Sequence, residues 1–183
     1  MIYELLADGF EETEAIAPVD LLRRAGLEVQ TVSITKEREV RGSHGIPVLA
    51  DLTMDQFSAD AEDTLILPGG KRGTDHLKAS EQVSRLLSAH AAGERGRIAA
   101  ICAAPSVLGR LGILRGKRAT CHAGFEDTLE GASFTDSPVV TDGLITTSRG
   151  MGTSIAFGLE LVKLLKDEET AERIAGDIHL RAD

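Results

Sequence analysis

Cysteine is scarce in this sequence, which contains only Cys102 and Cys121. The two residues form no C-x-x-C pair and show no zinc-type spacing with the five histidines, which argues against a disulfide scaffold and against a zinc site. Unpaired cysteines are typical of a reducing compartment. The N-terminus also lacks a basic segment followed by an apolar one, the pattern of a signal peptide. We therefore expect a cytoplasmic protein that uses no metal and no cofactor.

Basic residues and long apolar runs are also in short supply. Lys and Arg number 20 against 29 Asp and Glu, which gives a net charge of −9. Nucleic acid and acidic membrane surfaces repel a negative protein, so neither is expected as a partner. No apolar run approaches the roughly 20 residues that a bilayer-spanning helix needs. Aromatic residues make up only 3% of the chain, so the core must be built from Leu, Ile, Val and Ala.

The apolar residues, 42% of the 183-residue chain, fall into short runs and helical patterns. We expect one domain over residues 1–183, a length that buries an adequate core. Short runs bounded by turn residues predict strands, and helical spacing predicts helices. The predicted strands are residues 2–7, 27–34, 46–49, 64–67, 97–101, 118–121, 139–140 and 144–147, the last two joined by the hairpin signal Asp142-Gly143. The predicted helices are residues 14–25, 80–92, 105–111, 153–165 and 167–174.

Several of these strands are apolar on both faces, and helices separate most of them. This pattern predicts an α/β fold with a mostly parallel sheet and helices on both faces. In such folds ligands bind outside the carboxyl ends of the strands. Three segments of the sequence place unusual residues there.

The first segment is AAICAAPS, residues 99–106, in which Cys102 follows an apolar strand and precedes a helix that Pro105 opens. Small residues on both sides permit a sharp turn, which is the pattern of a nucleophile elbow. The free N–H groups and the dipole at the helix start favour thiolate over thiol. The alternative is a buried cysteine that packs as a small apolar residue. We favour the reactive interpretation, because an elbow position is rarely used for packing alone.

The second segment is DGFEETEA, residues 8–15, which follows the first strand and brings three acids to a helix start: Glu11, Glu12 and Glu14. Acidic side chains stabilise helix N-termini, and capping is the better interpretation for Glu11 and Glu12. The pattern alone assigns catalysis to none of the three.

The third segment is LPGGKRG, residues 67–73. Gly69 and Gly70 let the backbone approach a ligand closely, and with the N–H of Ala103 they are candidates for an oxyanion site. A plain turn is the alternative, since a Gly-Gly pair alone is a weak signal. The G-x-x-x-x-G-K-[ST] spacing of a phosphate-binding loop is absent.

His122 ends the strand that follows the helix after Cys102, and it is placed to reach the same pocket. A lone histidine is more often structural, so its role stays open at this point. Cys121 is its neighbour, and adjacent strand residues point to opposite faces. We expect Cys121 to pack in the core, with a resolving-thiol role as the minor alternative.

Five segments together resemble a known family. In order along the chain they are GFEETEAIAPVDLLRRAG, LILPGG, IAAICAAPSVL, ATCH and DGLITTSRGMGTS. They resemble the ThiJ/PfpI superfamily, and within it the branch of the Parkinson-disease protein DJ-one and its bacterial relatives. The match runs from Leu5 to about Leu165. It implies a flavodoxin-like three-layer sandwich, similar to class I glutamine amidotransferases, and a homodimer.

The resemblance also implies roles for individual residues. Cys102 matches the elbow cysteine of the family, and Glu14 matches the glutamate that hydrogen-bonds its sulfur. Gly70 and Ala103 match the backbone donors, and His122 matches the pocket histidine. Proteins of this branch are described as glutathione-independent glyoxalases, as deglycases and as oxidation-sensing protective proteins.

Departures from related patterns narrow the function. A peptidase of this superfamily has a histidine directly after the cysteine, where this chain has Ala103. An amidotransferase needs a late His-x-Glu pair, which the sequence around His179 lacks. Met151 stands where a proline is common, and His44 where an arginine lies near the dimer contact. Glu4 lies in the first predicted strand, where an apolar residue is expected, and the sequence offers no reason for it.

These observations lead to one main hypothesis and two alternatives. The main one is a cofactor-independent glyoxalase or deglycase, in which the Cys102 thiolate attacks a small dicarbonyl such as methylglyoxal and Glu14, with a raised pKa, moves a proton. The first alternative is an oxidation sensor, in which an oxidant takes Cys102 to sulfinic acid. The second alternative, a hydratase acting on an isocyanide, is compatible with the fold. It ranks lower, because such enzymes typically have an aspartate at the position of Glu14.

Overall fold

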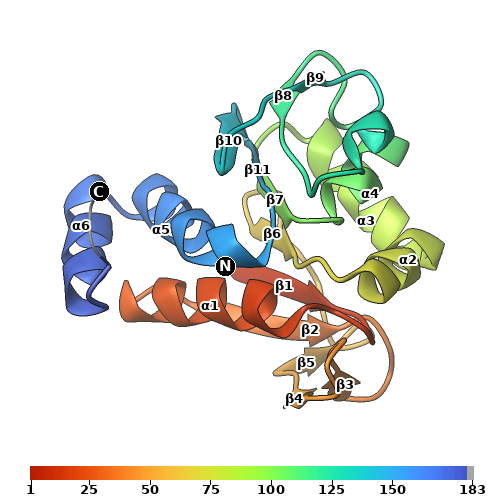
Figure 1. The fold of residues 1–183 in the computed structure, drawn as a ribbon. Helices are drawn as coiled ribbons and strands as arrows, with labels where there is room; N and C mark the ends of the chain where they lie inside the picture. Colours follow the sequence, from red (N-terminus) through yellow and green to blue (C-terminus); the bar gives the residue numbers. More distant parts are fainter. Residues whose placement is uncertain (181–183) are drawn as a thin grey trace.

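A seven-stranded sheet forms the centre of the computed structural model, which describes residues 1–180 (Figure 1). The strands lie in the spatial order β10 (Val139–Asp142), β11 (Ile145–Ser148), β7 (Arg97–Ile101), β6 (Thr64–Leu67), β1 (Ile2–Leu6), β2 (Val29–Ser33) and β5 (Leu52–Thr53). Neighbouring strands are parallel except β10 and β11, which form the predicted antiparallel hairpin. The predicted mostly parallel sheet is therefore confirmed.

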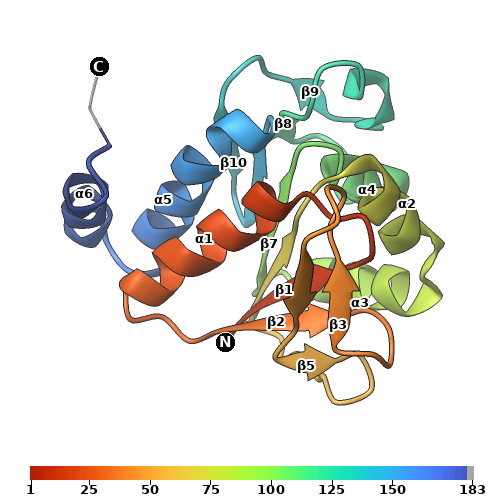
Figure 2. The same cartoon turned by 60° about the horizontal axis from the view of Figure 1, so that its bottom comes forward.

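Helices cover both faces of this sheet, as Figures 1 and 2 show. On one face lie α1 (Glu12–Arg24) and α5 (Ser154–Leu165), with α6 (Glu168–Asp177) packed against α5. On the other face lie α2 (Lys71–Ala79), α3 (Glu81–Ala92) and α4 (Pro105–Arg110). Two short 3-10 helices complete the elements of residues 1–180: η1 (Glu126–Thr128) lies between β8 and β9 in the sequence, and η2 (Met151–Thr153) directly precedes α5. The described residues thus form one three-layer α/β domain, and residues 181–183 of the predicted domain lie outside them.

Side chains that alternate along the strands build two apolar cores, one on each side of the sheet. In β1, Leu5 points into the core beneath α2, α3 and α4, whereas Ile2 points into the core beneath α1 and α5. Period-two alternation explains why one strand serves both layers. Burial on both faces is what made these strands read as continuous apolar runs.

Most predicted elements are confirmed to within a few residues. Strands β6 and β7 have the predicted bounds. Helix α1 begins two residues earlier than predicted, because the Glu11 side chain accepts the N–H of Glu14 and caps the first turn. Helix α6 begins at Glu168, directly after its predicted cap Asp167, and continues three residues beyond the predicted end, to Asp177.

Helix α2 is an element that the pattern did not predict. Its sequence KRGTDHLKA is mostly polar and holds one large apolar residue, Leu77, so no repeated apolar spacing marked it as a helix. The chain turns into this helix at Gly70, whose φ of +84° is a conformation that favours glycine. Tertiary packing, rather than local pattern, creates α2.

Two predicted strands lie outside the main sheet. The strand predicted at residues 46–49 is β4 (Pro47–Leu49), which pairs with the unpredicted β3 (Glu39–Arg41) in a separate hairpin. The strand predicted at residues 118–121 ends early, as β8 (Arg118–Ala119), and pairs with β9 (Ser133–Phe134). Cys121 and His122 therefore follow this strand instead of ending it.

Parallel pairing of β1, β6 and β7 sends their carboxyl ends to the same edge of the sheet. The segment 8–14 follows β1, Gly69 and Gly70 follow β6, and Cys102 follows β7. Among residues 1–180, no helix combines the length and the apolar character needed to cross a bilayer.

Candidate active site around Cys102

Cys102 occupies the turn between β7 and α4 in a strained backbone conformation. Its φ is +65°, a left-handed value that non-glycine residues seldom adopt. Its N–H donates to the Ser148 carbonyl at the end of β11 (2.9 Å), and the Ala104 N–H donates to the Ile101 carbonyl (3.0 Å). These bonds hold the turn against its strain, and the side chain remains partly exposed. The predicted elbow geometry is present.

Glu14 is the one acid of the three whose carboxyl points at the cysteine. It lies in the first turn of α1, and only 1% of its surface is exposed. Its carboxyl shares a hydrogen bond with the Cys102 thiol and accepts the Gly69 N–H at Oε2 (3.0 Å). The structure thus brings Cys102 and Glu14 together as predicted.

Three hydrogen bonds connect Glu14 to its surroundings in a closed ring. The Gly69 N–H donates to the Glu14 carboxylate, the Glu14 N–H donates to the Glu11 carboxylate (2.8 Å), and the Glu11 N–H donates to the Gly69 carbonyl (3.0 Å). The capping role predicted for Glu11 is therefore confirmed. It also fixes the first turn of α1 against the end of β6, which sets the position of the Glu14 side chain.

Gly69 corrects one prediction about the backbone donors. Its N–H is engaged by Glu14 and is not available to an oxyanion. A Cβ at this position would lie 2.4 Å from Glu14 Oε2 and 2.6 Å from Cys102 Cβ, so the residue must be glycine for the pair to meet. The N–H groups of Gly70 and Ala103 do approach the sulfur, where they favour its negative form.

Burial dominates the electrostatics of the Cys102–Glu14 pair. Burial raises the pKa of the Glu14 carboxyl to about 7, against the opposing effect of its hydrogen bonds. Burial also raises the pKa of the Cys102 thiol to about 12, and the Glu14 carboxylate adds to this rise. The predicted preference for thiolate is wrong while Glu14 is ionised, because burial and the carboxylate outweigh two N–H donors. Above neutral pH the pair therefore holds one proton, on the thiol, and the Glu14 carboxyl takes up a second as the pH falls through about 7.

His122 lies on the open side of this pair. Its backbone N–H donates to the Cys102 carbonyl (2.8 Å), and its side-chain Nδ1 contacts the Ala123 carbonyl (2.9 Å). A carbonyl only accepts, so Nδ1 carries a proton and the neutral ring keeps Nε2 as its acceptor.

Gly150 marks the space that the three side chains surround. A Cβ built there would lie 3.4 Å from the His122 ring, 3.7 Å from Glu14 Oε1 and 3.9 Å from Cys102 Sγ. Reasoning from spacing did not identify Gly150. The signal was a glycine two residues after the end of β11, at the same sheet edge as Cys102.

The remaining candidates lie away from this space. Cys121 is fully buried in the core on the α3 and α4 side, as the packing prediction required. Glu12 lies in the first turn of α1, as predicted, and its carboxylate also accepts hydrogen bonds from the N–H and Nδ1 of His44 (2.7 and 2.9 Å). Glu11, Glu12 and His44 bring ligand atoms within 4.8 Å of one another, but the bonds among them and to Glu14 already use these groups.

Comparison with known proteins shows the family to which this chain belongs. The model of the DJ-1/PfpI family matches residues 1–164. Protein dj-1beta of Drosophila melanogaster is 36% identical over 173 residues, 93% of this chain and 92% of that protein. Deglycase PfpI of Pyrococcus furiosus is 36% identical over 88% of this chain and 97% of that protein. The chain spans only 40% of the longer Protein DJ-1 homolog B of Arabidopsis thaliana, at 36% identity.

A solved structure described as oxidized Toxoplasma gondii DJ-1 superimposes with a TM-score of 0.92, at 32% identity, over 99% of this chain and 98% of that one. The family model covers most of the chain, and the fold agrees over nearly all of it. This chain belongs to the DJ-1/PfpI family.

Proposed function

We propose that this protein is a cofactor-independent glyoxalase or deglycase that acts on small dicarbonyls through Cys102. The observation that carries the proposal is the Glu14–Cys102 hydrogen bond beside the open face that Gly150 and His122 border. A relative of similar length, Deglycase PfpI, carries a name for this class of activity.

The chemistry starts from the state in which Cys102 is a thiol and Glu14 is ionised. As the sulfur of Cys102 attacks the aldehyde carbon of methylglyoxal, Glu14 accepts the thiol proton, and an S–C bond replaces the S–H bond. The aldehyde oxygen becomes an alkoxide that the N–H groups of Gly70 and Ala103 stabilise, and it then takes the proton from Glu14. This gives a hemithioacetal.

Glu14 next moves a hydrogen between two carbons. Its carboxylate removes the proton from the carbon bonded to sulfur, which gives an enediolate with its charge on the neighbouring oxygen. The hydroxyl proton passes from the first oxygen to this second oxygen, and Glu14 returns its own proton to the neighbouring carbon. The first carbon is now a thioester and the second bears a hydroxyl group. Water, activated at Nε2 of His122, cleaves the thioester and releases lactate. The sum is methylglyoxal plus water giving lactate, so the reaction is an internal oxidation and reduction.

The test is turnover of methylglyoxal without glutathione, with lactate measured by NMR. Cys102→Ser and Glu14→Gln should each lower kcat/KM by ~10²–10⁴-fold, the range for a lost catalytic group. Cys121→Ser is the matched control, because Cys121 is buried away from the site, and it should retain activity. Full activity in Cys102→Ser would show that the mechanism is wrong.

A second candidate is oxidation sensing at the same residue. The Glu14 carboxyl, with its pKa near 7, is partly protonated at neutral pH and able to donate a hydrogen bond to a sulfinate oxygen. The similarity to the oxidized Toxoplasma gondii protein supports this use. Mild peroxide should add two oxygens to Cys102 before any reach Cys121, as intact-mass and peptide spectra will show. Equal oxidation of both thiols would contradict it.

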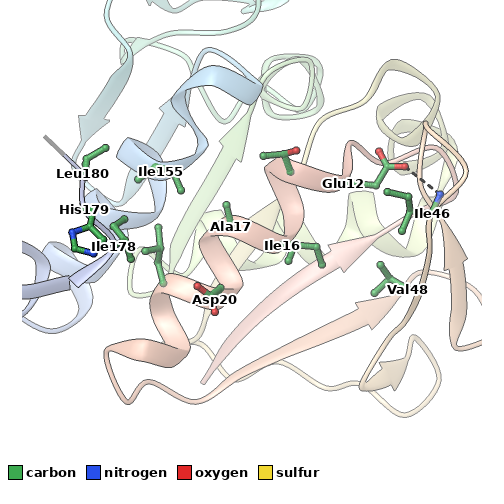
Figure 3. A pocket seen from close by; sticks show the side chains of 12 residues that line it. Glu12, Ile16, Ala17, Asp20, Ile46, Val48, Ile155, Ile178, His179 and Leu180 are labelled. Carbon is green, nitrogen blue, oxygen red and sulfur yellow. Dashed lines mark hydrogen bonds between the residues drawn. The ribbon is translucent and has the colours of Figure 1, made fainter. Parts of the chain in front are cut away.

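We also propose a homodimer in the cytoplasm. A groove of about 630 Å³ runs along α1 between the β3–β4 hairpin and the end of α6 (Figure 3). Its exposed apolar side chains include Ile16 and Ile46, while Glu14 and Cys102 lie outside its lining. Contiguous exposed apolar surface commonly marks a contact between proteins. Sedimentation should give a dimer that Ile16→Asp converts to monomer, whereas a monomeric wild type would contradict this.

The proposed cytoplasmic location is supported by the two free thiols, because unpaired cysteines are typical of a reducing compartment.

A further inference from the structure

The tip of the β3–β4 hairpin, residues 42–46, lies across the start of α1. The Ser43 N–H donates to the Phe10 carbonyl (2.7 Å), and the Arg41 carbonyl accepts the Gly9 N–H (2.7 Å). The hairpin lies outside the seven-stranded sheet, so contacts of this kind, and not strand pairing, hold it in place.

Glu12 of α1 is the centre of this contact. Its carboxylate is largely buried and accepts four hydrogen bonds from the tip: from the His44 N–H (2.7 Å), His44 Nδ1 (2.9 Å), the Ser43 hydroxyl (3.2 Å) and the Ile46 N–H (3.5 Å). Gly42 packs so closely that a Cβ there would lie 2.3 Å from Glu12 Oε1. Figure 3 shows Glu12 reaching the backbone of Ile46. A carboxylate bound this completely acts as an anchor.

The anchor lies inside the turn that positions the catalytic carboxyl. Glu11, the preceding residue, caps the helix by accepting the Glu14 N–H and donates its own N–H to Gly69. The first turn of α1 is therefore held on one side by Gly69 and on the other by the hairpin. We propose that the Glu12–His44 pair is a protonation-sensitive clasp that positions Glu14 against Cys102.

His44 is the group of the clasp that changes charge near neutral pH. Burial raises the pKa of Glu12, but hydrogen bonds from the His44 side chain and from nearby backbone N–H groups outweigh it and lower the pKa to about 2, so the carboxylate stays ionised. Among the described residues, the charged groups that face His44 are Glu12 and Glu11 of α1, and both carboxylates raise its pKa. Ser43 beside it is neutral, and Arg41 bonds other residues of the hairpin.

The direction of the pH effect follows from the raised pKa of His44. The charge-assisted bond to Glu12 is fully present below the ordinary histidine pKa of 6.5 and is lost as the pH rises through the raised value. The clasp is thus tight in mild acid and looser in mild alkali. A looser first turn lets Glu14 move from Cys102, which frees the thiol from the carboxylate that raises its pKa.

The experiment compares His44→Arg, a permanent cation, with His44→Asn, which never ionises. Two rates are measured between pH 6 and 9: alkylation of Cys102 by iodoacetamide, and turnover of methylglyoxal. At pH 8, His44→Asn should be alkylated several-fold faster than His44→Arg, yet turn over methylglyoxal several-fold more slowly. The wild type should follow His44→Arg at pH 6 and His44→Asn at pH 9. A general loss of structure would not move the two rates in opposite directions.

His76→Asn is the control, because His76 is another exposed histidine near the same edge and contacts the Asp8 carbonyl. Its alkylation profile should match that of the wild type. Identical alkylation profiles for His44→Arg and His44→Asn would overturn the clasp. The inference rests on the proposed role of Glu14, but alkylation is read without any substrate. Absent methylglyoxal turnover in the wild type would therefore count against the proposed function alone.

Discussion

Replacing Glu4 should make this protein more stable. Glu4 lies in the middle of β1, between Thr31 of β2 and Ile66 of β6, and is fully buried. Neither of its carboxyl oxygens has a hydrogen-bond partner among residues 1–180. Burial raises its pKa well above the ordinary value of 4.5, and Arg23 opposes this rise only in part. The folded chain therefore holds Glu4 as a neutral acid with unsatisfied polar atoms.

The magnitude follows from two costs that Glu4→Leu removes. Unsatisfied buried polar groups cost about 1–3 kcal/mol, and leucine at this position adds apolar surface to a core that already contains Ile66. The second cost depends on pH. A carboxyl with a raised folded-state pKa contributes stability below its unfolded pKa of 4.5 and loses it as the pH rises towards the folded value. Each pH unit in that window costs the wild type about 1.4 kcal/mol.

Urea unfolding followed by circular dichroism at pH 5 and pH 8 measures both costs. Glu4→Leu should be more stable than the wild type at pH 5, and the difference should widen at pH 8. Glu4→Gln is the control: it removes the ionisation but keeps polar atoms, so it should abolish the pH dependence with a smaller gain at pH 5. A variant Glu4→Leu that is less stable than the wild type at pH 8 would refute the reasoning, since it would require a stabilising partner for Glu4.

Three further predictions concern the site and its scaffold. Gly69→Ala should fold but lose nearly all turnover and change the alkylation rate of Cys102, because the new Cβ collides with Glu14 and Cys102; wild-type rates in both assays would contradict the geometry. In the pH profile of alkylation, the wild type should show an inflection near pH 7 from Glu14 that disappears in Glu14→Gln, and a persisting inflection would assign it to another group. Ser80→Ala should lower the free energy of unfolding by ~1 kcal/mol, because the Ser80 hydroxyl caps α3 by accepting the Val83 N–H, and calorimetry with Ser80→Asp as the conservative control checks this.

The chain's local patterns were enough to predict the elements whose signals are local. Apolar runs such as β6 and β7 are buried on both faces, so their composition alone marks them as central strands. The elbow at Cys102 was also predictable from a local signal, because a strand, small residues and a helix-opening proline follow one another directly in the sequence. Helix α2 and strand β3 were missed, because contacts with distant segments stabilise them and their own sequences contain few large apolar residues.

The sequence by itself therefore determined the layered fold, the sheet edge that bears the chemistry and the cysteine at its centre. Apart from the family resemblance, only the tertiary structure shows which of the three carboxyl groups contacts that cysteine. Three acids share one helix start, and their roles separate by partners that lie far away in the chain: Gly69 for Glu14 and His44 for Glu12. Tertiary structure also decided the protonation states of Cys102 and Glu14. Burial is a property of the packed chain, and it raises the pKa of both groups by more than the N–H groups at a helix N-terminus lower them.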